Sequence, residues 1–276
     1  MRIDSATIAI EPRSVGACID LASLFYREHA KEIFTLTVVF GVPSCLLSFW
    51  IASSSDYGLL WSAVLLFTLT PLLGSAVVSA AGRSVFGERM SARGALRALA
   101  RDFLPVLLSI VTTRTLTLFA AALCFGLPAP FVAVFYGFSS EVLLLEQLRG
   151  SRARERLVEL VKHTYFELVL RMSFLFLFAS VVVVSLFVLV DQTTGSLFGL
   201  PILFGRASSS YAWTETWQLV AYDPWVVATV SGLVWIVYPL ARLGWFFCYL
   251  DTRIRKEGWD VELAFRVEAR RLESLA

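Results

Sequence analysis

The sequence predicts an all-α, polytopic membrane protein with six transmembrane helices in three hairpins and amphipathic interfacial helices on the cytoplasmic side. Three observations predict this fold class: an apolar composition, six apolar stretches of spanning length, and an alternating placement of basic residues. Of the 276 residues, 57% are hydrophobic and only 17% are charged, and the mean hydropathy is +0.71. This composition is typical of membrane proteins and argues against one large or two small soluble domains.

Six apolar stretches are long enough to cross a bilayer, since a spanning helix needs about 20 mainly apolar residues. They lie at 33–52, 58–80, 104–124, 129–147, 168–190 and 225–250. The first follows about thirty mixed residues and has no adjacent A-x-A-like cleavage site, so we interpret it as a retained helix rather than a signal peptide. We expect a single integral membrane domain over 1–276. It consists of an amphipathic segment (1–32), a six-helix bundle (33–250) and an amphipathic tail (251–276).

The basic residues predict how the chain is threaded. Arg and Lys gather in the N-terminal segment, in the second-to-third and fourth-to-fifth connections, and in the tail. The connections "SSSDYG" and "FGLPAP" contain none, and the fifth-to-sixth connection contains only Arg206. Because basic segments stay on the cytoplasmic side, we expect both termini in the cytoplasm.

Three of the basic segments resemble one another. They read "SVGACIDLASLFYREHAKEIF", "SARGALRALARDFLPVLL" and "SRARERLVELVKHTYFELVL". Each opens with a serine, has apolar residues at helical spacing and leads into an odd-numbered span, so Ser14, Ser91 and Ser151 are predicted N-caps. The pattern predicts a unit of interfacial helix, span out and span back, used three times. Duplication of a stable hairpin is the preferred interpretation, and a transporter built from repeats is the alternative.

The most polar point inside a predicted span is "SIVTTRTLT" in the third, which contains Arg114. A charged side chain at mid-bilayer costs at least about 2.5–3.5 kcal/mol unless it is paired or wet. In an antiparallel hairpin that turns between Leu127 and Pro128, Glu141 lies as far from the turn as Arg114. We therefore predict that Arg114 and Glu141 face each other or share a polar cavity. An ion pair that fixes two helices is preferred over a substrate or proton pathway and over snorkelling of Arg114.

Other features inside the spans have a packing interpretation and a functional one. Pro43, Pro71 and Pro239 are expected to kink their helices, which can shape a binding site but is also tolerated in ordinary bundles. Ser75, Ser79 and Gly82 are small residues at helical spacing, which favours close approach of another helix. Packing is the preferred interpretation for both sets.

The connection at 191–224 is the only long segment on the predicted outer side. Its second half is rich in aromatic residues, namely Tyr211, Trp213, Trp217, Tyr222 and Trp225. Such residues favour the lipid headgroup level. We expect a short interfacial helix or a partly re-entrant loop here, and a ligand-binding lid is the alternative.

Patterns that carry catalytic or metal chemistry are scarce. The cysteines Cys18, Cys45, Cys124 and Cys248 follow no metal-like or disulfide spacing and are interpreted as packing residues. Two histidines, His29 and His163, lie in no recognisable nucleophile or metal motif. We therefore expect no catalytic, cofactor-binding or metal-binding residues, and no nucleic-acid partner.

The charged stretch "CYLDTRIRKEGWDVEL" follows the sixth span. Asp251 with Arg255 and Arg253 with Glu257 are predicted i, i+4 ion pairs. Gly258 is predicted to end the helix in a left-handed conformation, and Asp260 to cap a final amphipathic helix. We interpret the stretch as a corner between a spanning helix and a surface helix; a surface that docks a partner or lipid is the alternative.

This tail, together with "RSVGACIDLASLFYREH" and "LLLEQLRGSRARERLVELVKHTYFELVL", resembles a broad group of poorly characterised bacterial six-span membrane proteins. The group includes relatives of the membrane domain of some glycerophosphoryl diester phosphodiesterases. The resemblance implies a bacterial inner-membrane protein and a shared tail pattern. Phosphodiesterase activity is not implied, because that chemistry resides in a separate soluble domain. The residues that carry the tail pattern are Asp251, Arg253, Arg255, Glu257, Gly258 and Asp260.

The preferred functional hypothesis is a non-enzymatic scaffold or accessory subunit, whose partners are the lipid bilayer and other membrane proteins. A transporter of a small solute or lipid, which would use the polar region around Arg114, is the second hypothesis. A lipid-processing membrane enzyme is the third.

Overall fold

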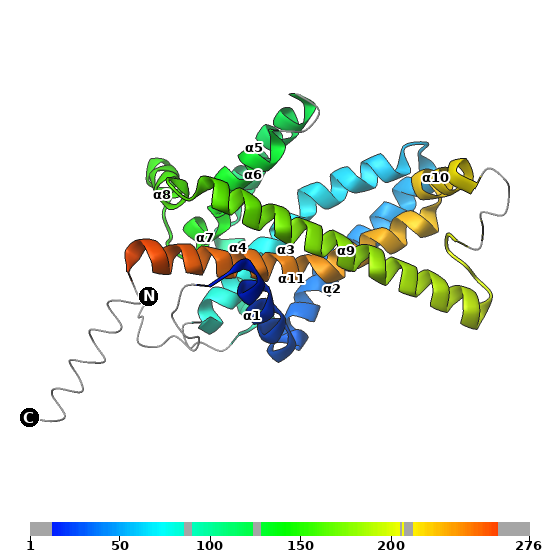
Figure 1. Ribbon diagram of the computed structural model, residues 1–276, viewed down its shortest axis with the longest axis horizontal. Helices are drawn as coiled ribbons and strands as arrows, with labels where there is room; N and C mark the ends of the chain where they lie inside the picture. The colour runs from blue at the N-terminus through cyan, green and yellow to red at the C-terminus, as the bar shows by residue number, and fades with distance from the viewer. Residues whose placement is uncertain (1–12, 86–89, 124–127, 205, 207–211, 259–276) are drawn as a thin grey trace, which may run out of the picture. The chain divides into compact units, whose positions relative to one another are not determined.

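The computed structural model describes residues 13–85, 90–123, 128–204, 206 and 212–258, and its regular elements there are all helices (Figure 1). In chain order they are α1 (Val15–Glu28), α2 (Ala30–Ser54), α3 (Gly58–Val85), α4 (Ala92–Arg101), α5 (Phe103–Ala122), α6 (Ala129–Phe135), α7 (Ser139–Leu144), α8 (Ser151–Val161), α9 (Tyr165–Phe198), α10 (Ala212–Tyr222) and α11 (Pro224–Glu257). The predicted all-α class is confirmed for this part of the chain.

Within the described residues, five helices are long and apolar enough to cross a membrane, namely α2, α3, α5, α9 and α11. The helices α9 and α11 have 34 residues each. At about 1.5 Å per residue such a helix is about 51 Å long, which exceeds the roughly 30 Å hydrocarbon core of a bilayer. Each of these helices is therefore several turns longer than the hydrocarbon core is thick, and the charged end of α11 need not lie in the apolar layer.

The fourth predicted span, 129–147, is not one helix. It consists of the short helices α6 and α7, which are separated by a turn at residues 136–138. In this turn the N–H groups of Gly137 and Ser139 donate to carbonyls three residues earlier, those of Val134 and Tyr136, at 3.0 Å each. Together α6 and α7 form an apolar stretch shorter than the five long helices. A sixth span at this position stays a prediction.

Each of the amphipathic helices α1, α4 and α8 comes directly before a long apolar helix, in the order that the sequence predicts. Their buried residues recur at helical spacing. Two of the predicted N-caps are confirmed: the Ser14 Oγ accepts from the Ala17 N–H, and the Ser91 Oγ accepts from the Gly94 N–H, both at 3.3 Å. The third is wrong, because α8 begins one residue earlier than expected: Gly150 is its N-cap and Ser151 is its first residue.

The joint between amphipathic and long helix has nearly the same backbone shape in the first two cases. A single residue joins α1 to α2, and a single residue joins α4 to α5. These residues are His29, with φ −111° and ψ 28°, and Asp102, with φ −106° and ψ 25°. The third joint is longer and differs, because residues 162–164 connect α8 to α9 and His163 has a φ of +68°.

The chain divides into two compact units. Unit 1 comprises Met1–Glu32, Ser75–Leu175 and Leu240–Ala276, and unit 2 comprises Ile33–Gly74 and Phe176–Pro239. In unit 1 the end of α11 packs with aromatic residues: Trp245 stacks on Phe138 with ring centroids 4.7 Å apart. In unit 2 a buried cluster is formed by Phe187, Leu203, Val226 and Leu233. The interpretation of 1–276 as a single domain stays a prediction.

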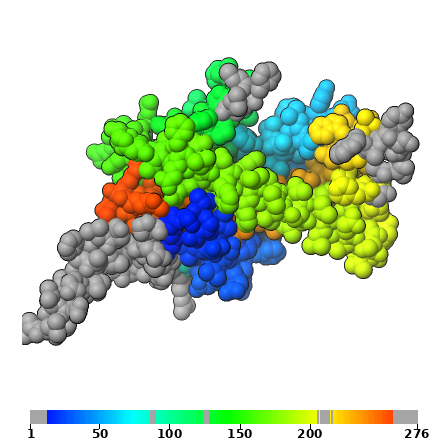
Figure 2. All heavy atoms as spheres, viewed as in Figure 1, coloured from blue at the N-terminus to red at the C-terminus, as the bar shows by residue number. Residues whose placement is uncertain are grey.

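Exposed apolar side chains cover α9. Phe174, Leu177, Val181 and Val184 are each more than half exposed, and Figure 2 shows the surface of α9 open on the face turned to the viewer. Soluble proteins rarely expose contiguous apolar patches larger than a few hundred Å². A helix with this surface suits contact with lipid, in agreement with its length and composition.

Features predicted inside the spans are found where the sequence indicates. Pro43, Pro71 and Pro239 lie inside α2, α3 and α11. In unit 1 the small residues of α3 adjoin α7 and the residue after it. The Ser75 Oγ lies 3.1 Å from the Ser140 Oγ, and a Cβ at Gly82 would collide with the Leu145 side chain. The predicted close approach along this stripe is confirmed.

In unit 2, the segment after α9 is held by Asp191. This carboxylate is buried and accepts backbone N–H groups of Ile202 and Leu203 at 2.8 and 2.6 Å. A short helix, α10, forms in the aromatic half of the connection, as one of the two predicted alternatives. Trp217 and Tyr222 are exposed. Tyr211 lies outside the described residues, as does the side chain of Trp213.

Candidate functional site

The charged end of α11 forms both of the ion pairs that its spacing predicts. The Arg255 Nε lies 3.0 Å from an Asp251 oxygen, and the Arg253 Nη2 lies 2.7 Å from a Glu257 oxygen. Gly258 has a φ of +65°, and its N–H donates to the Ile254 carbonyl at 3.0 Å. A left-handed residue here is the expected helix end. Asp260 and the final amphipathic helix predicted after it lie outside the described residues.

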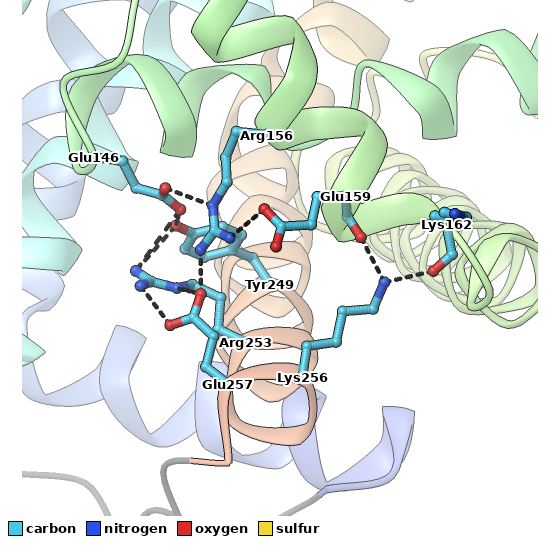
Figure 3. A network of polar contacts seen from close by, with 8 residues as sticks. All are labelled: Glu146, Arg156, Glu159, Lys162, Tyr249, Arg253, Lys256 and Glu257. Atoms are coloured by element: carbon cyan, nitrogen blue, oxygen red, sulfur yellow. Dashed lines mark hydrogen bonds and ion pairs between the residues drawn. The ribbon is translucent and has the colours of Figure 1, made fainter.

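Residues from α8 and from the chain after α7 extend these pairs into a network (Figure 3). The Tyr249 hydroxyl donates to one Glu146 oxygen at 2.6 Å, and the Arg156 Nε donates to the other at 2.8 Å. Arg156 also donates to Glu257. One guanidinium of α8 therefore links Glu146, which follows α7, to the end of α11.

The side chains at the centre of this network are nearly buried. Exposure is 11% for Glu146, 13% for Arg253 and 16% for Arg156. Burial alone would lower the pKa of the Arg156 guanidinium, but hydrogen bonds to Glu159, Glu146 and Glu257 outweigh it and raise the pKa. Arg156 is therefore always charged, and its donors are committed to carboxylates of this network.

Lys256 connects α11 to the end of α8 in a different way. Its Nζ donates to the backbone carbonyls of Glu159 and Lys162, at 2.8 and 2.5 Å. The last carbonyls of a helix have no partner within the helix, and a lysine is well suited to them because it also opposes the helix dipole. Lys256 thus serves as a C-terminal cap supplied by another helix (Figure 3).

Asp251 is the centre of a second group of contacts, which joins α9, α11 and the backbone just before α1. Its side chain is 2% exposed, and its oxygens accept from the Arg171 Nη1 at 2.6 Å and from the backbone N–H of Arg13 at 2.6 Å. Arg255 and Arg171 each also donate to the carbonyl of Arg13, at 3.0 and 3.4 Å. The backbone just before α1 is therefore bound to both α9 and α11.

Glu141 is the most deeply buried carboxylate of the predicted site residues, with no exposed surface. Both of its oxygens accept from one guanidinium, that of Arg242 on α11, at 2.7 and 2.9 Å. The sequence predicts that Arg114 faces this carboxylate or shares a polar cavity with it. The partner that the structure shows is Arg242, and the placement of Arg114 beside Glu141 stays a prediction. That prediction requires two continuous helices on either side of one turn, whereas the second is broken at residues 136–138. Arg114 lies on α5, is partly buried and has contacts of its own.

The turn that breaks the fourth predicted span is also bound to α11. The Trp245 Nε1 donates to the Gly137 carbonyl at 2.8 Å. A carbonyl released from the helical pattern needs a donor when water is absent. Trp245 supplies it three residues after Arg242, so one turn of α11 serves both the break and the carboxylate of α7.

Four residues of these contacts are not among the predicted site residues, namely Arg242, Arg171, Glu146 and Arg156. The signal that identified Arg114 applies equally to the first three, since each is a charged residue inside a predicted span. The predicted spans contain two glutamates and three arginines in all, and each of these charged residues needs a partner inside a membrane. Arg156 offered no such signal, because a charged residue on an amphipathic helix is ordinary.

Within the described residues, no three His, Cys, Asp or Glu side chains form a group that could hold a metal ion. Cys18 and Cys248 are buried, and Cys45 is partly buried. The predicted packing role of these three cysteines agrees with their burial, and Cys124 lies outside the described part of the chain.

No protein-family model, curated protein or solved structure matches the chain. The contacts of the site join α7, α8, α9 and α11 with the segment before α1 and with Glu146, which follows α7. Each of the central carboxylates is bound by at least one arginine, which makes the arrangement suited to holding helices in place.

Proposed function

We propose that the chain is a non-enzymatic scaffold or accessory subunit of the bacterial cytoplasmic membrane. One observation carries this proposal: the buried carboxylates of unit 1 are bound by arginines of the same unit. Glu141, with no exposed surface, is bound by both donors of Arg242, and Asp251, at 2% exposure, is bound by Arg171. Groups committed in this way fix helices in place. A fixed helical frame is what other membrane proteins need for docking.

The placement in the membrane has six spans in three hairpins, with α6 and α7 together as the fourth. Both termini and the amphipathic helices α1, α4 and α8 lie on the cytoplasmic side. The distribution of basic residues supports this orientation, and the shared joint shape at His29 and Asp102 supports a repeated unit. The same arrangement is the one that the resemblance to bacterial six-span membrane proteins implies, and we propose that relationship as well.

Reporter fusions test the placement. A phosphatase that is active only outside the cytoplasm and a fluorescent protein that matures only inside it are fused in turn after residue 276, after Ser54 and after Phe198. We expect fluorescence for the first fusion and phosphatase activity for the other two. Phosphatase activity at the C-terminal fusion would overturn the orientation.

Deletion of the gene in its own bacterium tests the scaffold role. We expect chemical cross-linking in intact cells to join the tagged chain to a defined membrane protein, whose abundance or assembly falls when the chain is absent. A tagged multi-pass protein of similar abundance serves as the control. A deletion strain with an altered solute or lipid content and unchanged membrane-protein assembly would contradict the proposal.

Transport of a small polar solute is the second candidate, and a specific observation in unit 2 favours it. The Ser44 and Ser48 hydroxyls of α2 and the Trp235 Nε1 of α11 are buried and make no hydrogen bond within the described part of the chain. The Cβ and Cγ of Trp235 lie within 3.2 Å of where a Cβ at Gly41 would be, so the two helices meet here. Buried polar atoms without partners are candidates for contact with water or a ligand.

Cysteine labelling separates the two candidates. In a background without the four native cysteines, Ser140→Cys and Ser48→Cys are exposed in membrane vesicles to a small, membrane-impermeant thiol reagent. A scaffold predicts that both positions are protected, whereas Ser54→Cys at an exposed helix end is modified rapidly. Fast modification at residue 48 that a specific solute suppresses would favour transport instead.

A further inference from the structure

A group of arginines lies where α4, α5 and the start of α8 meet in unit 1. Arg101 and Arg149 both contact the carboxylate of Asp102, the residue that joins α4 to α5. The Asp102 side chain is 12% exposed, whereas the arginines are 69% and 62% exposed. One carboxylate thus holds two guanidiniums of distant sequence position beside each other and leaves most of their surface open.

Two further arginines add to the positive charge of this group. Arg97 lies one helical turn before Arg101 on α4, and Arg152 lies in the first turn of α8. Both are exposed, and neither forms an ion pair with any residue whose placement the structure gives. Asp102 neutralises only one of the four charges, so the group of Arg97, Arg101, Arg149 and Arg152 is strongly basic. The nearest acidic residue on α8 is the exposed Glu155.

An exposed apolar stripe begins directly beside the arginines. The helix α5 starts at Phe103, the residue after Asp102, and it is one of the five spanning-length helices. Leu104, Leu108 and Val111 lie on one face of it and are 64%, 59% and 53% exposed. Positive charge at one end of an exposed apolar stripe is the order of groups that an anionic phospholipid requires, with its phosphate first and its acyl chains after it.

We propose that this group is a binding site for an anionic phospholipid. The guanidiniums of Arg101 and Arg149 hold the lipid phosphate, Arg97 and Arg152 add attraction, and the acyl chains follow α5. Arginine suits this task because its planar donors match two phosphate oxygens at once. A soluble anion would use only the charged half of the surface. The inference depends on the membrane placement in the proposed function.

Native mass spectrometry of the purified full-length chain in a nonionic detergent tests the site. The chain is titrated with phosphatidylglycerol or with zwitterionic phosphatidylcholine of the same acyl chains. We expect the first phosphatidylglycerol to bind about tenfold more tightly, the size that attraction to one or two arginines gives. R101Q/R149Q is expected to remove this preference, and the unchanged phosphatidylcholine affinity shows that the apolar stripe is intact.

The matched control is R93Q/R154Q, which removes the same charge from exposed positions on α4 and α8 that do not contact Asp102. We expect its phosphatidylglycerol affinity to equal that of the natural chain. Equal loss in both double variants would overturn the site and leave only diffuse attraction. If R101Q/R149Q does not purify as a monodisperse protein, R149Q alone, in the connection before α8, gives the same comparison.

Inorganic phosphate in large excess separates a lipid site from an anion site. We expect it to leave bound phosphatidylglycerol in place, whereas complete displacement would overturn the lipid proposal. These outcomes are distinct from failure of the proposed function. If the reporter fusions contradict the proposed membrane placement, the proposed function fails. If they support that placement and the chain shows no preference for phosphatidylglycerol, only the lipid site is refuted.

Discussion

Two buried carboxylates, Glu141 and Asp251, are held by arginines from other helices. Burial of each charged pair has an unfavourable and a favourable contribution to the free energy of folding. Moving a carboxylate and a guanidinium out of water costs free energy. The attraction between the two charges offsets this cost only when their geometry and hydrogen bonds are good. Glu141 has two donors from Arg242, and Asp251 has donors from Arg171, Arg255 and a backbone N–H. Each is therefore stable as a pair and costly as a single charge.

Glu141→Leu and Arg242→Leu are each expected to destabilise the chain by about 3–5 kcal/mol, because each leaves one charge buried without its partner. The double variant E141L/R242L is expected to recover most of that loss, since two apolar side chains replace the pair. Thermal unfolding in detergent, followed by size-exclusion chromatography, measures all three. A double variant no more stable than either single one would contradict the pairing.

Asp251→Ala is expected to cost about 3–5 kcal/mol, because Arg171 then loses its buried carboxylate and the segment before α1 loses its acceptor. Glu167→Ala is the control, since Glu167 binds the same guanidinium at 2.5 Å but is 49% exposed. An exposed pair is worth at most about 1 kcal/mol. Similar losses for the two variants would show that Asp251 has no central role.

At the scale of elements, α11 organises unit 1. Arg242, Trp245 and Tyr249 lie on successive turns of this helix, and Lys256 lies two turns after Tyr249. They bind, in order, a carboxylate of α7, a free carbonyl of the break, Glu146 after α7, and the carbonyl end of α8. One long helix therefore holds several short ones that could not be stable alone, because helices of fewer than about 12–15 residues are marginal by themselves.

Gly258→Val tests the end of α11. At a φ of +65°, a β-branched side chain is strained by roughly 1–2 kcal/mol or more, whereas Asn is tolerated. We expect faster tryptic cleavage at Arg253, Arg255 and Lys256 in the valine variant, because the last turn opens more often. Gly258→Asn should be cleaved at the rate of the natural chain. Equal rates for all three proteins would contradict the left-handed helix end.

Gly137→Ala tests the break between α6 and α7. A Cβ there would lie 2.8 Å from the Trp245 Cζ2, so the ring must move and its hydrogen bond to the Gly137 carbonyl weakens. We expect a loss of about 1–3 kcal/mol, as for other overpacked sites. Gly232→Ala on the same α11 is the control, because its Cβ would meet only the Cys45 sulfur at 3.8 Å. Thermal unfolding measures the stability of both variants. Equal stability of the Gly137→Ala and Gly232→Ala variants would contradict the close contact at Gly137.

At the scale of the whole molecule, local features were predictable and distant contacts were not. The caps at Ser14 and Ser91, the ion pairs within the last turns of α11 and the end at Gly258 depend on residues at most four positions apart. Helical periodicity and capping preferences describe such distances well. Glu141 and Arg242 are 101 positions apart, and Arg171 and Asp251 are 80 positions apart. No periodicity specifies which of several buried charges meet across that distance.

The break within 129–147 was not predicted, for a related reason. Hydropathy measures whether a stretch is apolar, and this one is. It does not detect a turn that Trp245 stabilises from another helix, because the stabilising group lies 108 positions away in the sequence. The displaced start of α8 is a smaller case, in which Gly150 took the capping position expected for Ser151.

The dependence of α6 and α7 on α11 also sets an order of events during synthesis. Gly137 and Glu141 are synthesised about a hundred residues before their partners Trp245 and Arg242. At about 5–20 residues per second this is a delay of roughly 5–20 seconds. Until then the segment is incomplete, and quality-control proteases can recognise it. A chain that stops before Pro224 should therefore be degraded rapidly, and a nascent chain should be most vulnerable in the interval before its last helix arrives.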